Sequence, residues 1–169
     1  MLAITTEPKI EYRTEQPTMG IRVQITIEEM GSGIIPQLHG EVMAYLQQQG
    51  TGPDGPPYMR FYVINMPGKM DIELGWPVAN PLPGNDRVKP GVIPVGRYAS
   101  LIYTGITNGI AGNKALIDWA AENGLAWDRW GDPAGDAFAA RVEFYLTDPD
   151  DEPDMAKRET EVAIKLVDG

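Results

Sequence analysis

The sequence predicts an α+β fold built from a tandem pair of strand-helix-strand-strand modules. Segments in which apolar and polar residues alternate predict strands, and two segments with apolar residues at helical spacing predict helices. The order strand, helix, strand, strand is found before residue 78 and again after residue 91. This repeat of roughly 80 residues is visible in the order of the elements more than in residue identity.

Alternation and helix-terminating residues define the elements of the first module. Residues 20–27 carry apolar side chains at every odd position, and residues 70–76 alternate in a similar way. Pro36 suits the first turn of a helix, and Gly50 suits its end. The predicted elements are strands over 10–16 and 20–27, a helix over 36–50, and strands over 58–65 and 70–76.

The second module repeats this order after a loop over residues 79–91, which is rich in proline, glycine and asparagine. A turn-rich stretch over 105–113 leads into a predicted helix that ends at Gly124. Residues 125–136 are predicted to form a second loop. The predicted strands of this module cover 96–103, 138–146 and 161–167.

Composition excludes several classes of function. The chain has 169 residues, a formal net charge of −10 and no visible basic patch, which opposes direct binding of nucleic acid. It has no cysteine and one histidine, so no disulfide, cysteine-zinc site or paired-histidine metal site is expected. No signal peptide or membrane-spanning run is visible, so we expect a cytoplasmic protein without cofactor, metal or membrane contact.

The second strand of the second module, predicted over 138–146, carries an unusual pair of polar residues. Val142, Phe144 and Leu146 alternate onto one face, which is predicted to be the core face. Glu143 and Tyr145 lie on the other face, so that an acid and a phenol stand side by side within a strand. This arrangement makes the second face a candidate site.

Each module carries a helix on one sheet face and leaves the other uncovered, so we expect the modules to meet through strands around a shared groove. In such a groove Glu143 would counter a ligand cation or act as a general base, because a desolvated carboxylate attracts cations strongly. The alternative is an exposed strand carboxylate paired with Arg141 or Lys165. Glu73 and Glu161 are expected to be solvated strand residues.

The other side of the groove is predicted to be apolar. Aligning the modules on the prolines of their last hairpin turns places Phe61 opposite Glu143 and Val63 opposite Tyr145. A groove that is acidic on one side and apolar on the other suits a flat amphipathic cation.

The ordered set of motifs resembles the GyrI-like domain family, which includes the effector-binding domain of bacterial multidrug-sensing transcription regulators. The resemblance covers nearly the whole chain. The matching segments are PYMRFYVIN (57–65), DIELGWPV (71–78), IPVGRYASLIYTG (93–105), KALIDWAAENGL (114–125) and the final hairpin over 142–167.

The resemblance implies two modules with pseudo-twofold symmetry around a central ligand groove, in which Glu143 occupies the position of the family's pocket glutamate. It implies one domain over 1–169, with module one at about 8–78, a connecting loop at 79–91 and module two at about 92–168. Tyr103 is expected to supply the aromatic contact that Thr107 lacks. The predicted ligand-binding residues are Glu143, Tyr145, Phe61, Val63, Tyr103, Trp127 and Trp130.

The function implied by the resemblance is that of a standalone protein binding small hydrophobic, aromatic or cationic molecules. One alternative is a hydrolase of reactive alkylating, cyclopropane-type compounds, with Glu143 activating water and Tyr145 or Tyr103 protonating the leaving group. A second alternative is a gyrase-inhibitor-like interaction protein with an unknown protein partner. The chain carries no helix-turn-helix segment, so a regulatory role would need another chain.

Overall fold

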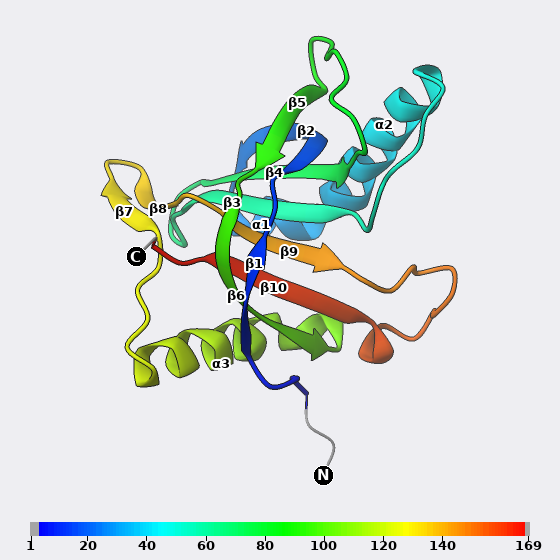
Figure 1. The fold of residues 1–169 in the computed structure, drawn as a ribbon. Coiled ribbons are helices and arrows are strands. Elements are labelled where there is room, and N and C mark those ends of the chain that lie inside the picture. The colour runs from blue at the N-terminus through cyan, green and yellow to red at the C-terminus, as the bar shows by residue number, and fades with distance from the viewer. Residues whose placement is uncertain (1–3, 168–169) are drawn as a thin grey trace.

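Two long helices and a curled antiparallel sheet make up the computed structural model, which describes residues 4–167 (Figure 1). Residues 1–3 and 168–169, the ends of the predicted domain, lie outside the described part. The strands are β1 (Lys9–Arg13), β2 (Gln16–Ile25), β3 (Tyr58–Ile64), β4 (Met70–Pro77), β5 (Lys89–Ile93), β6 (Gly96–Thr104), β7 (Arg129–Asp132), β8 (Gly135–Phe138), β9 (Arg141–Tyr145) and β10 (Glu159–Lys165). The helical segments are α1 (Ile27–Glu29), η1 (Met30–Ile34), α2 (Ile35–Gln48), η2 (Ile106–Asn108), α3 (Gly109–Glu122) and η3 (Met155–Lys157).

The predicted α+β class is confirmed, and both halves of the chain contain the predicted order of elements. The first half contains β2, α2, β3 and β4 in this order, and the second half contains β6, α3, β9 and β10, with β7 and β8 inserted between α3 and β9. The strand order in the sheet is β1-β6-β10-β9-β3-β4-β2-β5. The twofold relation between the halves stays a prediction.

The antiparallel ladder between β3 and β9 joins the two halves into one sheet. Met59 is paired with Glu143 in this ladder, with one residue pair on either side of them. β1, which precedes the first half, pairs with β6 of the second half. β5, which precedes the second half, pairs with β2 of the first half.

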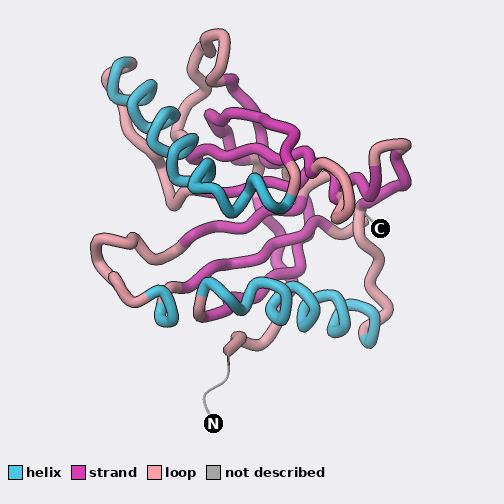
Figure 2. The backbone as a smooth tube through the Cα atoms, turned by 180° about the vertical axis from the view of Figure 1, so that it is seen from behind, coloured by secondary structure: helices cyan, strands magenta, loops and turns pink. Residues whose placement is uncertain are grey.

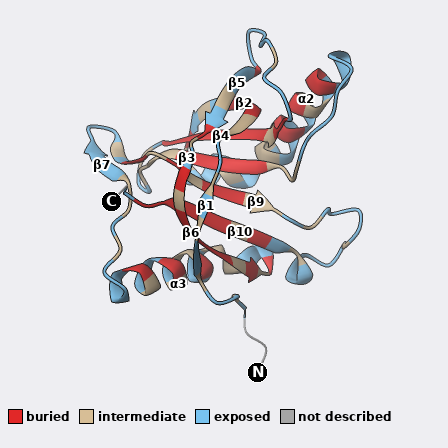
Figure 3. Cartoon of the chain, viewed as in Figure 1, coloured by how far each residue is buried: buried red, intermediate tan, exposed pale blue. Residues whose placement is uncertain are grey.

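Both helices cover the same face of the sheet (Figure 2). Leu38, Val42 and Leu46 of α2 pack on the apolar side chains of β2, β3 and β4. Leu116 of α3 packs on the apolar face of β6 and β10. Burial is concentrated along the central strands and the inner sides of the helices (Figure 3). Each helix therefore has its own core over its own half.

The opposite face of the sheet curls around a third, smaller core. Tyr58, Tyr98, Val142 and Ala163 are buried there. Arg60 reaches from β3 across the curled face and donates from its two terminal nitrogens to the carbonyl oxygens of Val92 (2.8 Å) and Ala139 (2.9 Å). The edge strand β5 is thereby held over this face.

Several predicted boundaries are wrong. Residues 125–136, predicted as a loop, contain β7 and the start of β8, which form a hairpin beside β3. The connecting loop over 79–91 contains the start of β5. The predicted strand over 138–146 is interrupted after Phe138, and Leu146, expected in the core, is 41% exposed. The helix predicted from 114 begins at Gly109.

Gly75 is required where β2 and β4 meet. A Cβ at this position would lie 2.2 Å from the carbonyl oxygen of Met19 and 2.7 Å from the hydroxyl of Tyr58. We expect Gly75→Ala to lower the free energy of unfolding by more than about 2 kcal/mol, measured by denaturant titration. Gly40→Ala, on the exposed side of α2 with no atom near the new Cβ, should raise it by about 0.5–1 kcal/mol. Equal effects of the two substitutions would contradict the packing described for Gly75.

Candidate functional site

A buried carboxylate lies near the centre of the sheet. Glu143 on β9 is 8% exposed, and its Oε1 accepts a hydrogen bond of 2.7 Å from the hydroxyl of Tyr103 on β6. β10 lies between these two strands, so the contact spans it. The expected strand position of Glu143 is therefore correct, and the structure gives it a phenol partner.

Tyr145 lies on the same side of the sheet as this pair. Thr160 on β10 is the cross-strand partner of both Tyr103 and Tyr145, so one row of sheet positions places a phenol on either side of it. The ring of Tyr145 meets the ring of His39 from α2 edge to face, with 5.8 Å between ring centroids. Tyr145 therefore lies between the Glu143 carboxylate and helix α2.

These residues lie on the helix-bearing face between α2 and α3, so the expectation of an uncovered face is wrong. Tyr103 packs under α3, where a Cβ added at Gly112 would lie 2.7 Å from its ring and one at Gly109 would lie 3.3 Å from its hydroxyl. Tyr145 packs against the core under α2. The reason is that β9 is a central strand, and both of its faces are covered by other parts of the chain.

Burial shifts the ionisation of the Glu143 carboxyl toward the neutral form. Burial raises the pKa of Glu143 above its ordinary value of 4.5, while the hydrogen bond from Tyr103 and the charge of Arg141 act in the opposite direction. Burial and the nearby Glu143 charge raise the pKa values of Tyr103 and Tyr145, so both phenols remain protonated at neutral pH.

The predicted alternative is wrong: Glu143 is neither exposed nor paired with Arg141 or Lys165. Arg141 donates to Oδ1 of Asn113 on α3 at 2.9 Å and lies over the ring of Phe138. The Nζ of Lys165 contacts Asp128 at 2.9 Å. Within residues 4–167, no ion pair within 4 Å is formed by Glu143.

The other predicted site residues are only partly gathered around this centre. Phe61 is buried in the core that Tyr145 contacts, but the cross-strand partners of Glu143 are Met59 on β3 and Val162 on β10. Val63 lies at a bulge in β3. Trp127 packs with the core that contains Tyr103. Trp130 is 51% exposed on the β7–β8 hairpin and paired with Ala137, away from the carboxylate.

The burial of His39 and Glu73 was not predicted from the sequence. The Nε2 of His39 donates to the carbonyl of Tyr58 at 2.8 Å, and burial lowers the pKa of the imidazole. Glu73, expected to be solvated, is 5% exposed on the opposite face of the sheet, and burial raises its pKa. Glu161 is partly buried and contacts Arg13 at 2.9 Å. Glycine at position 20, directly beneath the Glu73 side chain, is the sequence signal for that burial.

Two negative findings concern the described residues. No group of three or more histidine, cysteine, aspartate and glutamate side chains among residues 4–167 is arranged to hold a metal ion. No helix in the same range is long and apolar enough to cross a membrane.

The fold and the family identify the chain as a small-molecule-binding domain. The family model for the GyrI-like small molecule binding domain matches residues 6–166, and the chain belongs to this family. The family expected from the sequence motifs is thereby confirmed. Comparison with curated protein sequences gives no significant match.

Solved structures share this fold at low sequence identity. The C-terminal domain of EcmrR has a TM-score of 0.69 at 14% identity, with 96% of this chain and 98% of that chain covered. In the EcmrR–DNA complex this chain spans only 59% of the EcmrR chain. SAV2435 bound to tetraphenylphosphonium has a TM-score of 0.63 at 11% identity, covering 96% and 94%. A hydrolase from Listeria innocua has a TM-score of 0.63 at 14% identity, covering 95% and 92%.

The raised pKa of Glu143 predicts a pH-dependent cost of folding. The folded state holds the proton to a higher pH than the unfolded state, so the Glu143 contribution to stability falls as pH rises from about 4.5 through the folded pKa. Glu143→Gln should therefore gain stability relative to the wild type across this window, with no difference below it, measured by denaturant unfolding at a series of pH values. A wild type that is the more stable protein at pH 7 would contradict the prediction.

Proposed function

We propose that this protein binds small hydrophobic molecules, aromatic or cationic in character, in a groove between α2 and α3, with Glu143 as the electrostatic anchor. The observation that carries the proposal is a buried carboxylate whose described contact is a single hydrogen bond from Tyr103 and which forms no ion pair within residues 4–167. Burying such a group is unfavourable unless a cation or a proton neutralises it. A ligand cation would replace the proton.

The surroundings of Glu143 support an aromatic cation rather than a metal ion. The neighbouring side chains are two phenols, a thioether and a phenyl ring: Tyr103, Tyr145, Met59 and Phe61 line or adjoin the position. Aromatic faces and thioethers favour large, polarisable cations, whereas hard metal ions need several oxygen ligands. The tetraphenylphosphonium bound to SAV2435 belongs to this chemical class. We include Trp127 in the proposed wall and leave out Trp130, which is half exposed on the hairpin.

We also propose that the two halves are related by an approximate twofold axis through the β3–β9 ladder. Support comes from the mirrored strand order on either side of this ladder. The axis would pass near the Arg60–Val142 pair and would exchange Phe61 with Glu143. In this proposal the groove lies on the axis. Glu143 makes one side of the groove acidic, and Phe61 makes the symmetry-related side apolar.

A titration with tetraphenylphosphonium tests the anchor. We expect saturable quenching of tryptophan fluorescence in the wild type, and Glu143→Gln should weaken binding by about tenfold or more, because the buried charge pair is lost. Glu73→Gln is the matched control, since it removes a buried carboxylate from the opposite face. It should bind as the wild type does. Unchanged affinity in Glu143→Gln, with the fold intact by circular dichroism, would remove Glu143 from the proposed site.

Hydrolysis is a second candidate, favoured by the 2.7 Å contact between the Tyr103 hydroxyl and Glu143. In this scheme the ionised Glu143 takes a proton from water as the oxygen attacks an electrophilic ring carbon. The carbon–carbon bond of the strained ring breaks, and Tyr103 or Tyr145 protonates the leaving carbon. Incubation with a cyclopropane-bearing alkylating agent, followed by mass spectrometry, should then show a product heavier by one water. Glu143→Gln should abolish it, and a product formed equally by that variant would exclude the scheme.

A further inference from the structure

A cavity of about 410 Å³ opens on the face of the sheet opposite Glu143. Its volume lies within the range of ~300–1,000 Å³ that small-molecule sites usually have. The turn between β1 and β2, the loop before β3 and the end of β4 form its walls. Pro56 and Pro77 stiffen two of these walls, and a Cβ at Gly55 would already lie 3.3 Å from Pro77.

The floor of the cavity is apolar and belongs to the smaller core of the curled face. Phe144 and Pro56 line the cavity and are partly exposed, and Tyr12 at its edge is 69% exposed. The lining residues Ile93, Tyr98, Val142 and Ala163 belong to the buried core and present almost no surface. The hydroxyl of Tyr98 donates to the carbonyl of Pro94 at 2.6 Å, so it is not available to a ligand. Such a floor favours an apolar, flat ligand over water.

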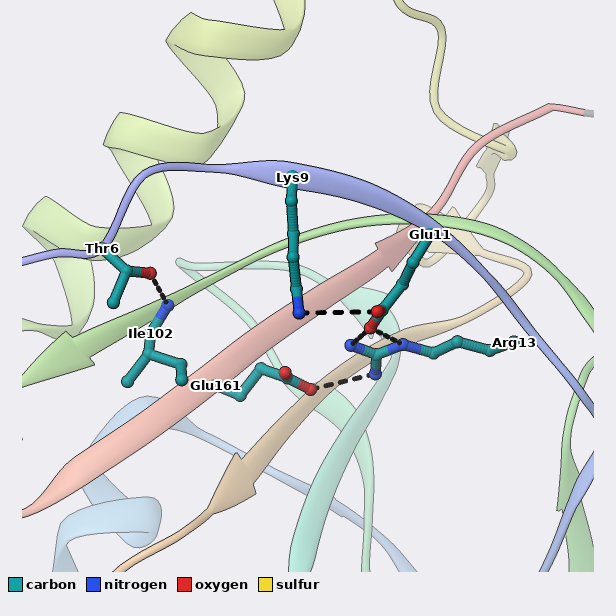
Figure 4. A network of polar contacts seen from close by, with 6 residues as sticks. All are labelled: Thr6, Lys9, Glu11, Arg13, Ile102 and Glu161. Atoms are coloured by element: carbon teal, nitrogen blue, oxygen red, sulfur yellow. Dashed lines mark hydrogen bonds and ion pairs between the residues drawn. The ribbon is translucent and has the colours of Figure 1, made fainter.

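One cationic side chain stands at the rim and is held in position by a polar network (Figure 4). Arg13 contacts Glu11 through Nη2 at 2.6 Å and Glu161 through Nη1 at 2.9 Å, and its guanidinium lies 5.7 Å from the Tyr98 ring centroid. Each terminal nitrogen carries a second N–H group, which these contacts do not use. Arg13 is therefore a pre-positioned hydrogen-bond donor beside an apolar floor.

The network has no net charge. Lys9 contacts Glu11 at 3.4 Å, so two cations and two carboxylates balance one another. An ionic ligand would lose its hydration on the apolar floor without gaining a full counter-charge, whereas a neutral one would not. Asp54, the other charged lining residue, is exposed and remains hydrated.

We infer that this cavity is a second binding site, for a neutral flat aromatic molecule that carries a hydrogen-bond acceptor such as a ketone. The aromatic body packs against Phe144 and Pro56, above the buried core of the curled face, and the acceptor receives a hydrogen bond from Arg13. The site is distinct from the groove proposed between the helices, because alternate side chains of β9 face the two sites. The inference does not rest on the proposed function.

The test uses 6-propionyl-2-dimethylaminonaphthalene, a neutral naphthalene ketone whose emission shifts to the blue in apolar surroundings. We expect saturable 1:1 binding to the wild type. Thr14→Trp, at an exposed lining position in the β1–β2 turn, fills the mouth of the cavity and should weaken binding by about tenfold or more. Thr51→Trp, the same change in an exposed loop that does not line the cavity, should leave affinity within about twofold.

Glu143→Gln separates this site from the groove between the helices. It should bind the naphthalene ketone as the wild type does, and tetraphenylphosphonium should not displace the dye. Absence of saturable binding to the wild type would overturn the inference. So would loss of binding in Glu143→Gln with full binding in Thr14→Trp, because the dye would then occupy the helix-side groove.

Discussion

The short ladder between β3 and β9 is the constraint on which the arrangement of both faces depends. It pairs only three residues on each strand, yet it makes one sheet from two halves. Because side chains alternate along a strand, the pairing of Met59 with Glu143 turns both toward the helices. The adjacent pair, Arg60 and Val142, is turned to the curled face. A shift of one residue in this ladder would exchange the two sets.

The acid at the centre of this ladder is unfavourable for folding on its own. Tyr103 supplies one hydrogen bond, and Arg141 supplies a charge that is directed toward Asn113 rather than toward the carboxylate. The buried Glu73 on the other face has cationic neighbours. Arg60 and Arg22 lower its pKa against the effect of burial, and both guanidinium groups lie over the ring of Tyr62, at 3.8 Å for Arg22 and 4.4 Å for Arg60. Glu73 is thus surrounded by cations, whereas Glu143 has one hydrogen bond and no ion pair among the described residues.

The sequence was sufficient for the elements whose patterns are long and regular. α2 and β2 follow from periodicity, and the common face of Glu143 and Tyr145 follows from alternation. Alternation defines two faces but does not say which one a helix covers, so the side of the sheet was assigned wrongly. The Tyr103–Glu143 contact depends on the position of β10 between β6 and β9, which no local pattern encodes. The β7–β8 hairpin was missed because its strands are four residues long and largely exposed.

The outer strands β1 and β5 are exchanged between the two halves of the chain. β1, which comes before the first half in the sequence, forms the edge strand of the second half. β5, which comes before the second half, forms the edge strand of the first. A domain-swapped dimer exchanges strands between two chains in the same way, and here the exchange takes place within one chain. A cut in the loop before β5 would leave two fragments that each carry the other's missing strand. Each fragment would expose an unpaired sheet edge when alone, and the two would complement one another when mixed.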